Sequence, residues 1–249
     1  MYVELETMEF QPEETVLKIK SGLDVHAWYF SSRKPAKAVI VFFHGNGQNR
    51  TSHIVSLYWL IKAGYDLLAL DYPGYGDTDG KPTPENTVET GHAALRYVAA
   101  KKPKLPIIVY GQSLGGAVAL RTVIDMKDEI KPALVVADST FLSYQKAAQN
   151  VLSKSWVTWL LQPLAWVLLS DRYAPKGAVA SISPIPLLVI HARDDTVVPF
   201  KLGEEVFNKA QEPKEFWPLE KGWHIGTFST PDGPRIRQKF LEKLKKMGL

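Results

Sequence analysis

Short, continuous apolar segments recur along the chain, and stretches with a helical pattern separate most of them. Five of these segments contain no charged residue: 39–43, 67–70, 107–110, 134–137 and 187–190. Continuous apolarity, rather than strict alternation, is what a strand needs when helices cover both faces of its sheet. The pattern therefore predicts five central parallel strands.

Helical patterns are predicted at residues 51–63, 84–100, 114–126, 201–210 and 231–247. A sixth strand-like stretch, residues 214–219, precedes the last of them. Strands and helices that alternate in this way predict an α/β fold with a mostly parallel sheet and helices on both faces.

The beginning of the chain has a different pattern. Residues 15–20 and 25–31 flank the turn Ser21-Gly22-Leu23-Asp24, which is typical of an antiparallel hairpin. The distance between the strands at 134–137 and 187–190 is far greater than one crossover helix needs. We therefore expect one domain over residues 1–249, with an N-terminal antiparallel hairpin and a helical cap insert at about 141–183.

Composition narrows the function classes. The chain has 249 residues, of which 45% are hydrophobic, enough for a substantial core. The net charge of +4 is too small to predict a nucleic-acid partner. Cysteine is absent, which excludes disulfides, thiolate metal sites and a cysteine nucleophile.

The first ten residues do not resemble a secretory signal. They include Glu4, Glu6 and Glu9, without a basic start or an apolar stretch. The default expectation is a cytoplasmic protein, and the loss of a natural leader or anchor is the alternative.

A nucleophile motif follows the third of the five strands. Residues 107–110 run into Gly111-Gln112-Ser113-Leu114-Gly115, a G-x-S-x-G pattern, and a helix is predicted from Leu114. Glycines two positions before and after the serine allow a sharp turn that exposes its hydroxyl. A plain glycine turn with a solvated serine is the alternative.

A serine nucleophile requires a histidine base and a carboxylate that orients the base. Only His191 and His224 follow Ser113 in the chain. His191 ends a strand, where hydrogen bonding to nearby backbone is the simpler expectation, so His224 is the favoured base. The earlier histidines His26, His53 and His92 are expected at the surface or in helix packing.

Three aspartates after Ser113 follow predicted strands closely enough to orient the base. Asp194 and Asp195 come just after the strand at 187–190, and Asp138 follows the strand at 134–137. Parallel strands bring such positions together at one edge of the sheet. The pattern alone leaves these three alternatives open and favours the loop of Asp194 and Asp195.

An oxyanion loop is predicted after the strand at 39–43, in His44-Gly45-Asn46-Gly47. Small residues there allow a backbone N–H to approach a developing oxyanion, together with the N–H of the residue after the nucleophile. We favour Asn46 and Leu114 as the two donors, with His44 as a brace for the loop. A plain glycine turn is the alternative.

These motifs, in this order, resemble the α/β-hydrolase family, and the similarity extends over almost the whole chain from about residue 39. The motifs are His44-Gly45-Asn46-Gly47, Asp71-Tyr72-Pro73-Gly74-Tyr75-Gly76, Gly111-Gln112-Ser113-Leu114-Gly115, Asp195-Thr196-Val197-Val198-Pro199 and Gly222-Trp223-His224. The order is most similar to the serine-hydrolase branch described as Bem46-like or ABHD13-like.

The resemblance implies Ser113 as nucleophile, His224 as base and Asp195 as orienting acid. Asp195 is preferred to Asp194 because the acid in this family stands four positions before the proline, here Pro199. One departure is the sequence Asn46-Gly47-Gln48-Asn49, where Asn-Ala-Gly is commoner in that branch.

No metal or organic cofactor is expected. The glycine-rich segment 74–80 lacks a following P-loop lysine and is interpreted as a structural turn. The acids Asp77, Asp79 and Glu85 have no histidine close in sequence and are interpreted as a solvated loop.

The predicted cap contains an apolar segment, residues 156–169, with Trp156, Trp159 and Trp166. This segment is too short for a transmembrane helix and contains a proline. It is expected to pack a cap helix pair onto the body, or to line an acyl pocket or contact a lipid surface.

Together these features predict a serine hydrolase that cleaves carboxylic esters, with an apolar acyl group, through an acyl-enzyme. The expected partner is a small ester molecule, with lipid esters among the candidates. The alternatives are a thioesterase, a serine peptidase or amidase, and a non-catalytic protein that binds a lipid or partner through the tryptophan-rich insert.

Overall fold

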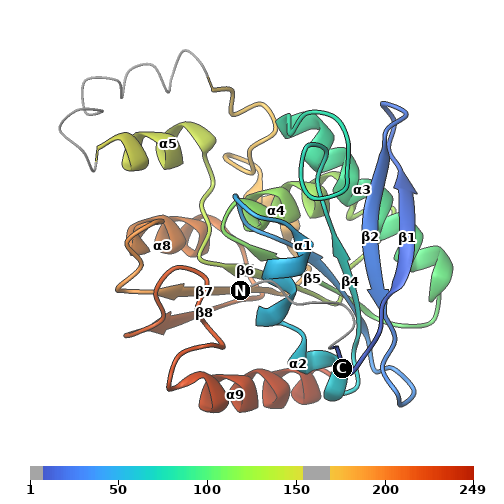
Figure 1. The fold of residues 1–249 in the computed structure, drawn as a ribbon. Helices are drawn as coiled ribbons and strands as arrows, with labels where there is room; N and C mark the ends of the chain where they lie inside the picture. The colour runs from blue at the N-terminus through green and yellow to red at the C-terminus, as the bar shows by residue number, and fades with distance from the viewer. Residues whose placement is uncertain (1–7, 154–168) are drawn as a thin grey trace.

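The computed structural model describes residues 8–153 and 169–249. Its centre is an eight-stranded sheet with the order β1-β2-β4-β3-β5-β6-β7-β8 (Figure 1). The strands are β1 Glu13–Lys18, β2 Asp24–Phe30, β3 Val39–Phe43, β4 Asp66–Leu70, β5 Ile107–Gln112, β6 Leu134–Asp138, β7 Leu187–Ala192 and β8 Lys214–Leu219.

The sheet is mostly parallel, as predicted. β1 pairs with β2 and β2 with β4 in antiparallel orientation, whereas all pairs from β4 through β8 are parallel. Every residue of β3, β4, β5, β6 and β7 is buried. Burial on both faces explains why these strands have continuous rather than alternating apolar sequences.

Helices cover both faces of the sheet (Figure 1). One apolar core joins the sheet to α3 Pro84–Lys101, α4 Leu114–Met126, α8 Phe200–Lys209 and the 3₁₀ helix η3 Val179–Ile182. A second core, on the opposite face, joins it to η2 Ile54–Ser56, α2 Trp59–Lys62 and α9 Gly233–Lys246, and α1 Arg50–His53 precedes η2 in the chain. The predicted α/β-hydrolase architecture is confirmed.

The prediction of one helix over residues 51–63 was wrong. The segment forms α1, η2 and α2, three short elements in succession. Its fully buried positions Ile54, Leu57 and Leu60 are spaced by three residues. A 3₁₀ turn has three residues per turn and aligns such positions on one side, whereas an α-helix rotates them apart.

The strand order places a crevice at the carboxyl ends of β3 and β5. β3 lies between β4 and β5 in the sheet, so the chain leaves β3 toward one neighbour and returns later on the other side. The helical connection after β3 covers one face, and α4, after β5, covers the other. Ligands of open α/β sheets bind at such reversal points.

The connection between β6 and β7 contains α5 Tyr144–Leu152 and η3 in its described part. Figure 1 shows α5 apart from the layers that pack on the sheet. Tyr144 and Ala147 of α5 pack against a small apolar cluster that includes Phe141 and Leu202. Across the described residues, no helix combines the length and apolarity that a membrane crossing requires.

Candidate active site

Ser113 lies at the junction of β5 and α4 in a strained conformation. Its φ is 54° and its ψ is −120°, far from the regions that a serine ordinarily adopts. A Cβ at Gly111 would lie 2.4 Å from the carbonyl oxygen of Gly115, and one at Gly115 would lie 2.2 Å from that of Phe43. The flanking positions therefore accept only glycine, and the turn is as sharp as the sequence motif predicts.

Two hydrogen bonds brace this turn, one from the neighbouring strand β6 and one from the loop that follows it. The backbone N–H of Ser113 donates to the carbonyl oxygen of Asp138 at 2.9 Å. The hydroxyl of Thr140 donates to the carbonyl oxygen of Ser113 at 2.6 Å. Contacts of this kind hold a residue in a conformation that costs about 1–3 kcal/mol when isolated.

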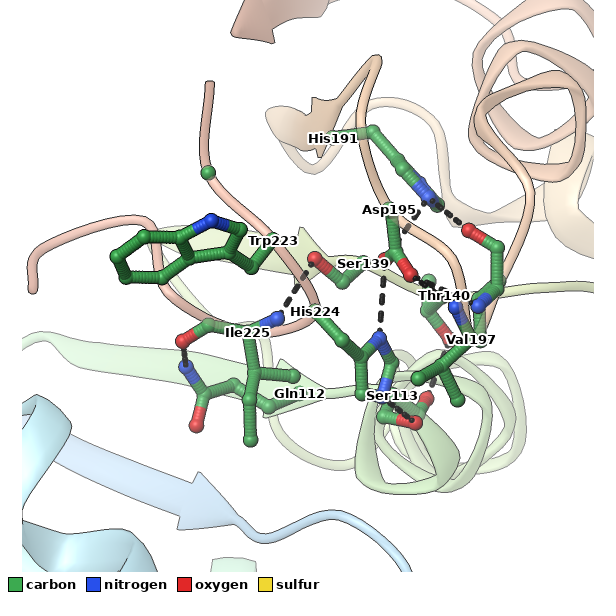
Figure 2. A network of polar contacts seen from close by, with 12 residues as sticks. Gln112, Ser113, Ser139, Thr140, His191, Asp195, Val197, Trp223, His224 and Ile225 are labelled. Carbon is green, nitrogen blue, oxygen red and sulfur yellow. Dashed lines mark hydrogen bonds and ion pairs between the residues drawn. The ribbon is translucent and has the colours of Figure 1, made fainter. Parts of the chain in front are cut away.

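His224 lies between Ser113 and Asp195 (Figure 2). Its Nε2 is 2.9 Å from the hydroxyl oxygen of Ser113, and its Nδ1 is 2.9 Å from Oδ2 of Asp195. The second carboxylate oxygen of Asp195 accepts the backbone N–H groups of Val197 and Val198 at 2.8 and 2.9 Å. This is the distance pattern of a nucleophile, a base and an orienting acid.

The carboxylate of Asp195 is buried but held in its charged form. Burial acts to raise its pKa, whereas hydrogen bonds from His191, His224 and the Val198 N–H act in the opposite direction. The net result is a pKa well below the usual range of an aspartate. A charged acceptor at Nδ1 leaves Nε2 of His224 free to accept the Ser113 proton.

His191 takes the role expected of a strand-end histidine. Its ring is fully buried, and Nε2 lies 2.8 Å from the carbonyl oxygen of Val198 and 3.5 Å from Oδ2 of Asp195. Figure 2 shows it on the side of Asp195 opposite His224. It therefore supports the loop of Asp195 and lies apart from Ser113.

The two alternative acids have other partners. Oδ1 of Asp194 accepts the backbone N–H groups of Gly222 and Trp223 at 2.9 and 3.0 Å. Asp138 is fully buried and accepts the side chains of Tyr110, Gln112, Ser139 and Thr227 at 2.8–3.2 Å. Of the three aspartates considered from sequence, Asp195 is the one at hydrogen-bond distance from His224.

The predicted oxyanion loop lies directly beside Ser113. A Cβ added to Gly45 would lie 3.4 Å from the Ser113 Cβ. Leu114 is the first residue of α4, where helix N–H groups lack intrahelical acceptors and the helix dipole favours negative charge. Asn46 and Leu114 line the same cleft as Ser113, and the Asn46 Oδ1 accepts the Tyr75 hydroxyl at 2.6 Å.

His44 braces this loop from below. It is fully buried, and its Nδ1 lies 2.7 Å from the carbonyl oxygen of Gly45. Burial, reinforced by the proximity of His53, lowers the pKa of His44 from 6.5 to about 3. The ring is therefore neutral at physiological pH, and its contact with the Gly45 carbonyl oxygen supports the loop.

Sequence reasoning did not assign His53 to the site. The residue is buried, and its Nε2 lies 3.1 Å from the carbonyl oxygen of Gly47 in the predicted oxyanion loop. Burial also lowers the pKa of its ring. His53 and Gly47 are only six positions apart, but no motif considered from the sequence links them.

Arg50 was also missed from sequence. Its guanidinium is 2% exposed and pairs with the carboxylate of Asp71, which also accepts the Arg50 backbone N–H at 2.7 Å. The same guanidinium contacts Asp77 at 2.7 Å and lies over the Trp28 ring at 4.6 Å. Asp77 is thus exposed, as expected, but it also forms an ion pair with Arg50.

A cleft of about 630 Å³ opens at Ser113. Its walls are mainly apolar and include Phe141, Ala147, Val151, Leu169, Val198 and Leu202. The residues expected to line an acyl pocket, Trp156, Trp159 and Trp166, lie outside the described residues. Among residues 8–153 and 169–249, no three acidic or histidine side chains form a group that could hold a metal ion.

The fold and the strand–turn–helix geometry around Ser113 define an α/β hydrolase. The chain belongs to the family whose model, Hydrolase_4, is described as serine aminopeptidase, S33, and which matches residues 34–180. The match identifies the family as a whole, so the finer Bem46-like assignment stays a prediction.

Several relatives are similar over most of this chain. The uncharacterized protein YfhR of Escherichia coli K12 is 31% identical over 236 residues, which cover 92% of this chain and 79% of YfhR. The lysophosphatidylserine lipase ABHD12 of Danio rerio is 29% identical over 233 residues, covering 86% of this chain and 60% of ABHD12.

Among solved structures, the Pyrococcus furiosus esterase Pf2001 has the same fold, with a TM-score of 0.75 and 19% identity over 98% of this chain and 94% of the esterase chain. The family and these relatives support hydrolase activity of an esterase-like kind.

Proposed function

We propose that this protein hydrolyses carboxylic esters with an apolar acyl group, through an acyl-enzyme on Ser113. One observation carries the proposal: a continuous hydrogen-bonded series runs from the Ser113 hydroxyl through His224 to Asp195, with both distances at 2.9 Å, beside a mainly apolar cleft.

Acylation begins when Nε2 of His224 takes the proton of the Ser113 hydroxyl as its oxygen attacks the ester carbonyl carbon. The carbonyl oxygen becomes an oxyanion, for which the backbone N–H groups of Asn46 and Leu114 are the proposed donors. Each such donor contributes about 3 kcal/mol in the transition state. His224 then gives its proton to the departing alcohol.

Deacylation repeats these steps with water as the nucleophile. His224 takes a proton from water, whose oxygen attacks the acyl carbon, and then returns a proton to the Ser113 oxygen as the acid is released. Asp195 fixes the ring orientation and stabilises the imidazolium in both halves. The buried, charged carboxylate suits that role.

The apolar acyl group is proposed from the cleft walls. A cavity of about 630 Å³ lies within the range of small-molecule sites and could hold a medium or long acyl chain. We assign residues 141–183 as the cap of a single domain, since α5 contributes one wall of the cleft. Trp156, Trp159 and Trp166, which lie outside the described residues, stay proposed as substrate-binding residues.

Cleavage of amides is the second candidate. The description of the family as serine aminopeptidase favours it. The same triad can serve both ester and amide cleavage. Turnover of matched ester, thioester and anilide substrates with one acyl group separates an esterase from a thioesterase or a peptidase. A preference for the anilide would reassign the reaction while leaving the residue roles unchanged.

Ester hydrolysis is tested with p-nitrophenyl esters from acetate to palmitate. We expect turnover by the wild-type protein, loss of turnover in Ser113→Ala, and an optimum beyond acetate. If Ser113→Ala retains full activity, the proposed nucleophile is wrong. If the folded wild-type protein neither turns over these substrates nor reacts with a phosphonate probe, a non-catalytic lipid- or partner-binding role replaces the proposal.

A further inference from the structure

The loop that carries His224 is strained on both sides of this residue. Trp223 has a φ of 48° and Ile225 a φ of 58°. Positive φ is uncommon for residues other than glycine, and for a β-branched or bulky side chain it is a true outlier. Such conformations persist only where surrounding contacts hold them.

The contacts on the two sides of His224 differ in length. After His224, the Ile225 N–H donates to the Ser139 hydroxyl oxygen at 3.4 Å, and the Gln112 side chain donates to the Ile225 carbonyl oxygen at 3.4 Å. Before His224, Oδ1 of Asp194 accepts the N–H groups of Gly222 and Trp223 at 2.9 and 3.0 Å. In the described part of the chain, these two are the shorter of the four hydrogen bonds to the backbone of residues 222–225.

Gly222 adds a second point of attachment beside Asp194. A Cβ at this position would lie 2.6 Å from the Cβ of Ala192, the last residue of β7. The backbone of the loop is therefore packed directly on the end of the strand from which Asp194 and Asp195 emerge. Asp194 and Asp195 therefore contact the loop of His224 from the same strand end.

We propose that Asp194 is a positioning residue: its carboxylate holds the strained backbone before His224, so that Nε2 of His224 lies at hydrogen-bond distance from the Ser113 hydroxyl. The neighbouring carboxylates then divide the work. Asp195 orients the imidazole ring, and Asp194 orients the backbone that carries it. This inference rests on the proposed role of His224 as the base.

Replacing Asp194 separates this role from that of Asp195. Asp194→Ala removes both acceptor contacts, and we expect kcat to fall about 10- to 100-fold with little change in KM, the effect of misplacing a catalytic group by about 1 Å. Asp194→Asn keeps a carbonyl oxygen that accepts both N–H groups, so we expect its kcat within about fivefold of wild type. Rates are expressed per site titrated with a fluorophosphonate, which removes the effect of unfolded molecules.

A second variant tests the strain directly. Asparagine tolerates positive φ better than tryptophan does, and the Trp223 side chain is 59% exposed, so its replacement removes little packing. Figure 2 shows the Trp223 indole directed away from His224 and Asp195. In a Trp223→Asn background the loop depends less on Asp194, and we expect Asp194→Ala to reduce kcat by a smaller factor than in the wild-type background.

Three results would overturn the inference. They are an Asp194→Ala variant with wild-type kcat, an equal loss of kcat in Asp194→Ala and Asp194→Asn, and the same loss in both Trp223 backgrounds. Failure of the proposed function itself is distinct, since the wild-type protein would then show neither phosphonate labelling nor ester turnover.

Discussion

The guanidinium of Arg50 is paired with the carboxylate of Asp71 in the protein interior, where the two side chains are 2% and 0% exposed. Arg50 follows the oxyanion loop and Asp71 follows β4, so the pair joins two loops that meet at the cleft. Tyr75, from the second of these loops, donates its hydroxyl to Asn46 of the first. The predicted oxyanion loop is thus held by contacts both inside the protein and at its surface.

Breaking this pair should reduce stability strongly. Arg50→Met leaves the Asp71 carboxylate buried without its cation, and we expect the free energy of unfolding to fall by about 3–5 kcal/mol. Denaturant unfolding measures the change. Arg50→Met combined with Asp71→Asn removes the unpaired charge and should be more stable than Arg50→Met alone. Equal stability of the two variants would contradict this explanation.

The neutral state of His44 should make stability depend on pH. Burial lowers its folded-state pKa to about 3, whereas the unfolded chain has a pKa near 6.5, so the unfolded state binds more protons between these values. The contribution is complete above about pH 6.5 and is lost as the pH falls toward 3, with a slope of up to about 1.4 kcal/mol per pH unit from this group. His44→Asn should show a smaller slope over that range, measured by denaturant unfolding at each pH. An unchanged slope would refute the role of His44.

The assignment of the orienting acid can be tested by a single amide substitution. Asp195→Asn keeps the shape of the side chain but no longer favours the tautomer of His224 that can accept the Ser113 proton. We expect kcat to fall by about 10⁴-fold, as measured by ester hydrolysis with Ser113→Ala as the background control. A loss of less than tenfold would remove Asp195 from the proposed triad.

The width of the cleft should set the preferred acyl chain. Ala147 of α5 lines the cleft, and Ala147→Trp adds an indole to that wall. We expect KM to rise for long-chain p-nitrophenyl esters while the acetate ester, which serves as the internal control, is hydrolysed as before. If all chain lengths are affected equally, the acyl group does not bind along α5.

Much of the fold was predictable because it depends on local signals. Each of the five buried strands contains an apolar run of four or five residues, and α4 begins and ends where its pattern does, at Leu114 and Met126. The sharp turn at Ser113 was equally predictable, since Gly111 and Gly115 are required by close contacts with the backbone of α4 and of β3.

What the sequence did not reveal depends on contacts between distant segments. Arg50 is charged and follows a loop, so nothing in its surroundings along the chain indicates burial, and its partner Asp71 is 21 residues away. The pattern alone left Asp194 and Asp195 as alternatives, and the resemblance was needed to prefer Asp195, because the loop residues that separate them, Gly222 and His224, lie 28 and 29 positions further along the chain.

The most direct test of Ser113 as the nucleophile is mass spectrometry of the protein after reaction with a fluorophosphonate. We predict a single adduct, located on the peptide that contains Ser113, absent in Ser113→Ala and formed much more slowly in His224→Gln. An adduct on another residue, or none on the folded wild-type protein, would contradict the proposed serine hydrolase mechanism.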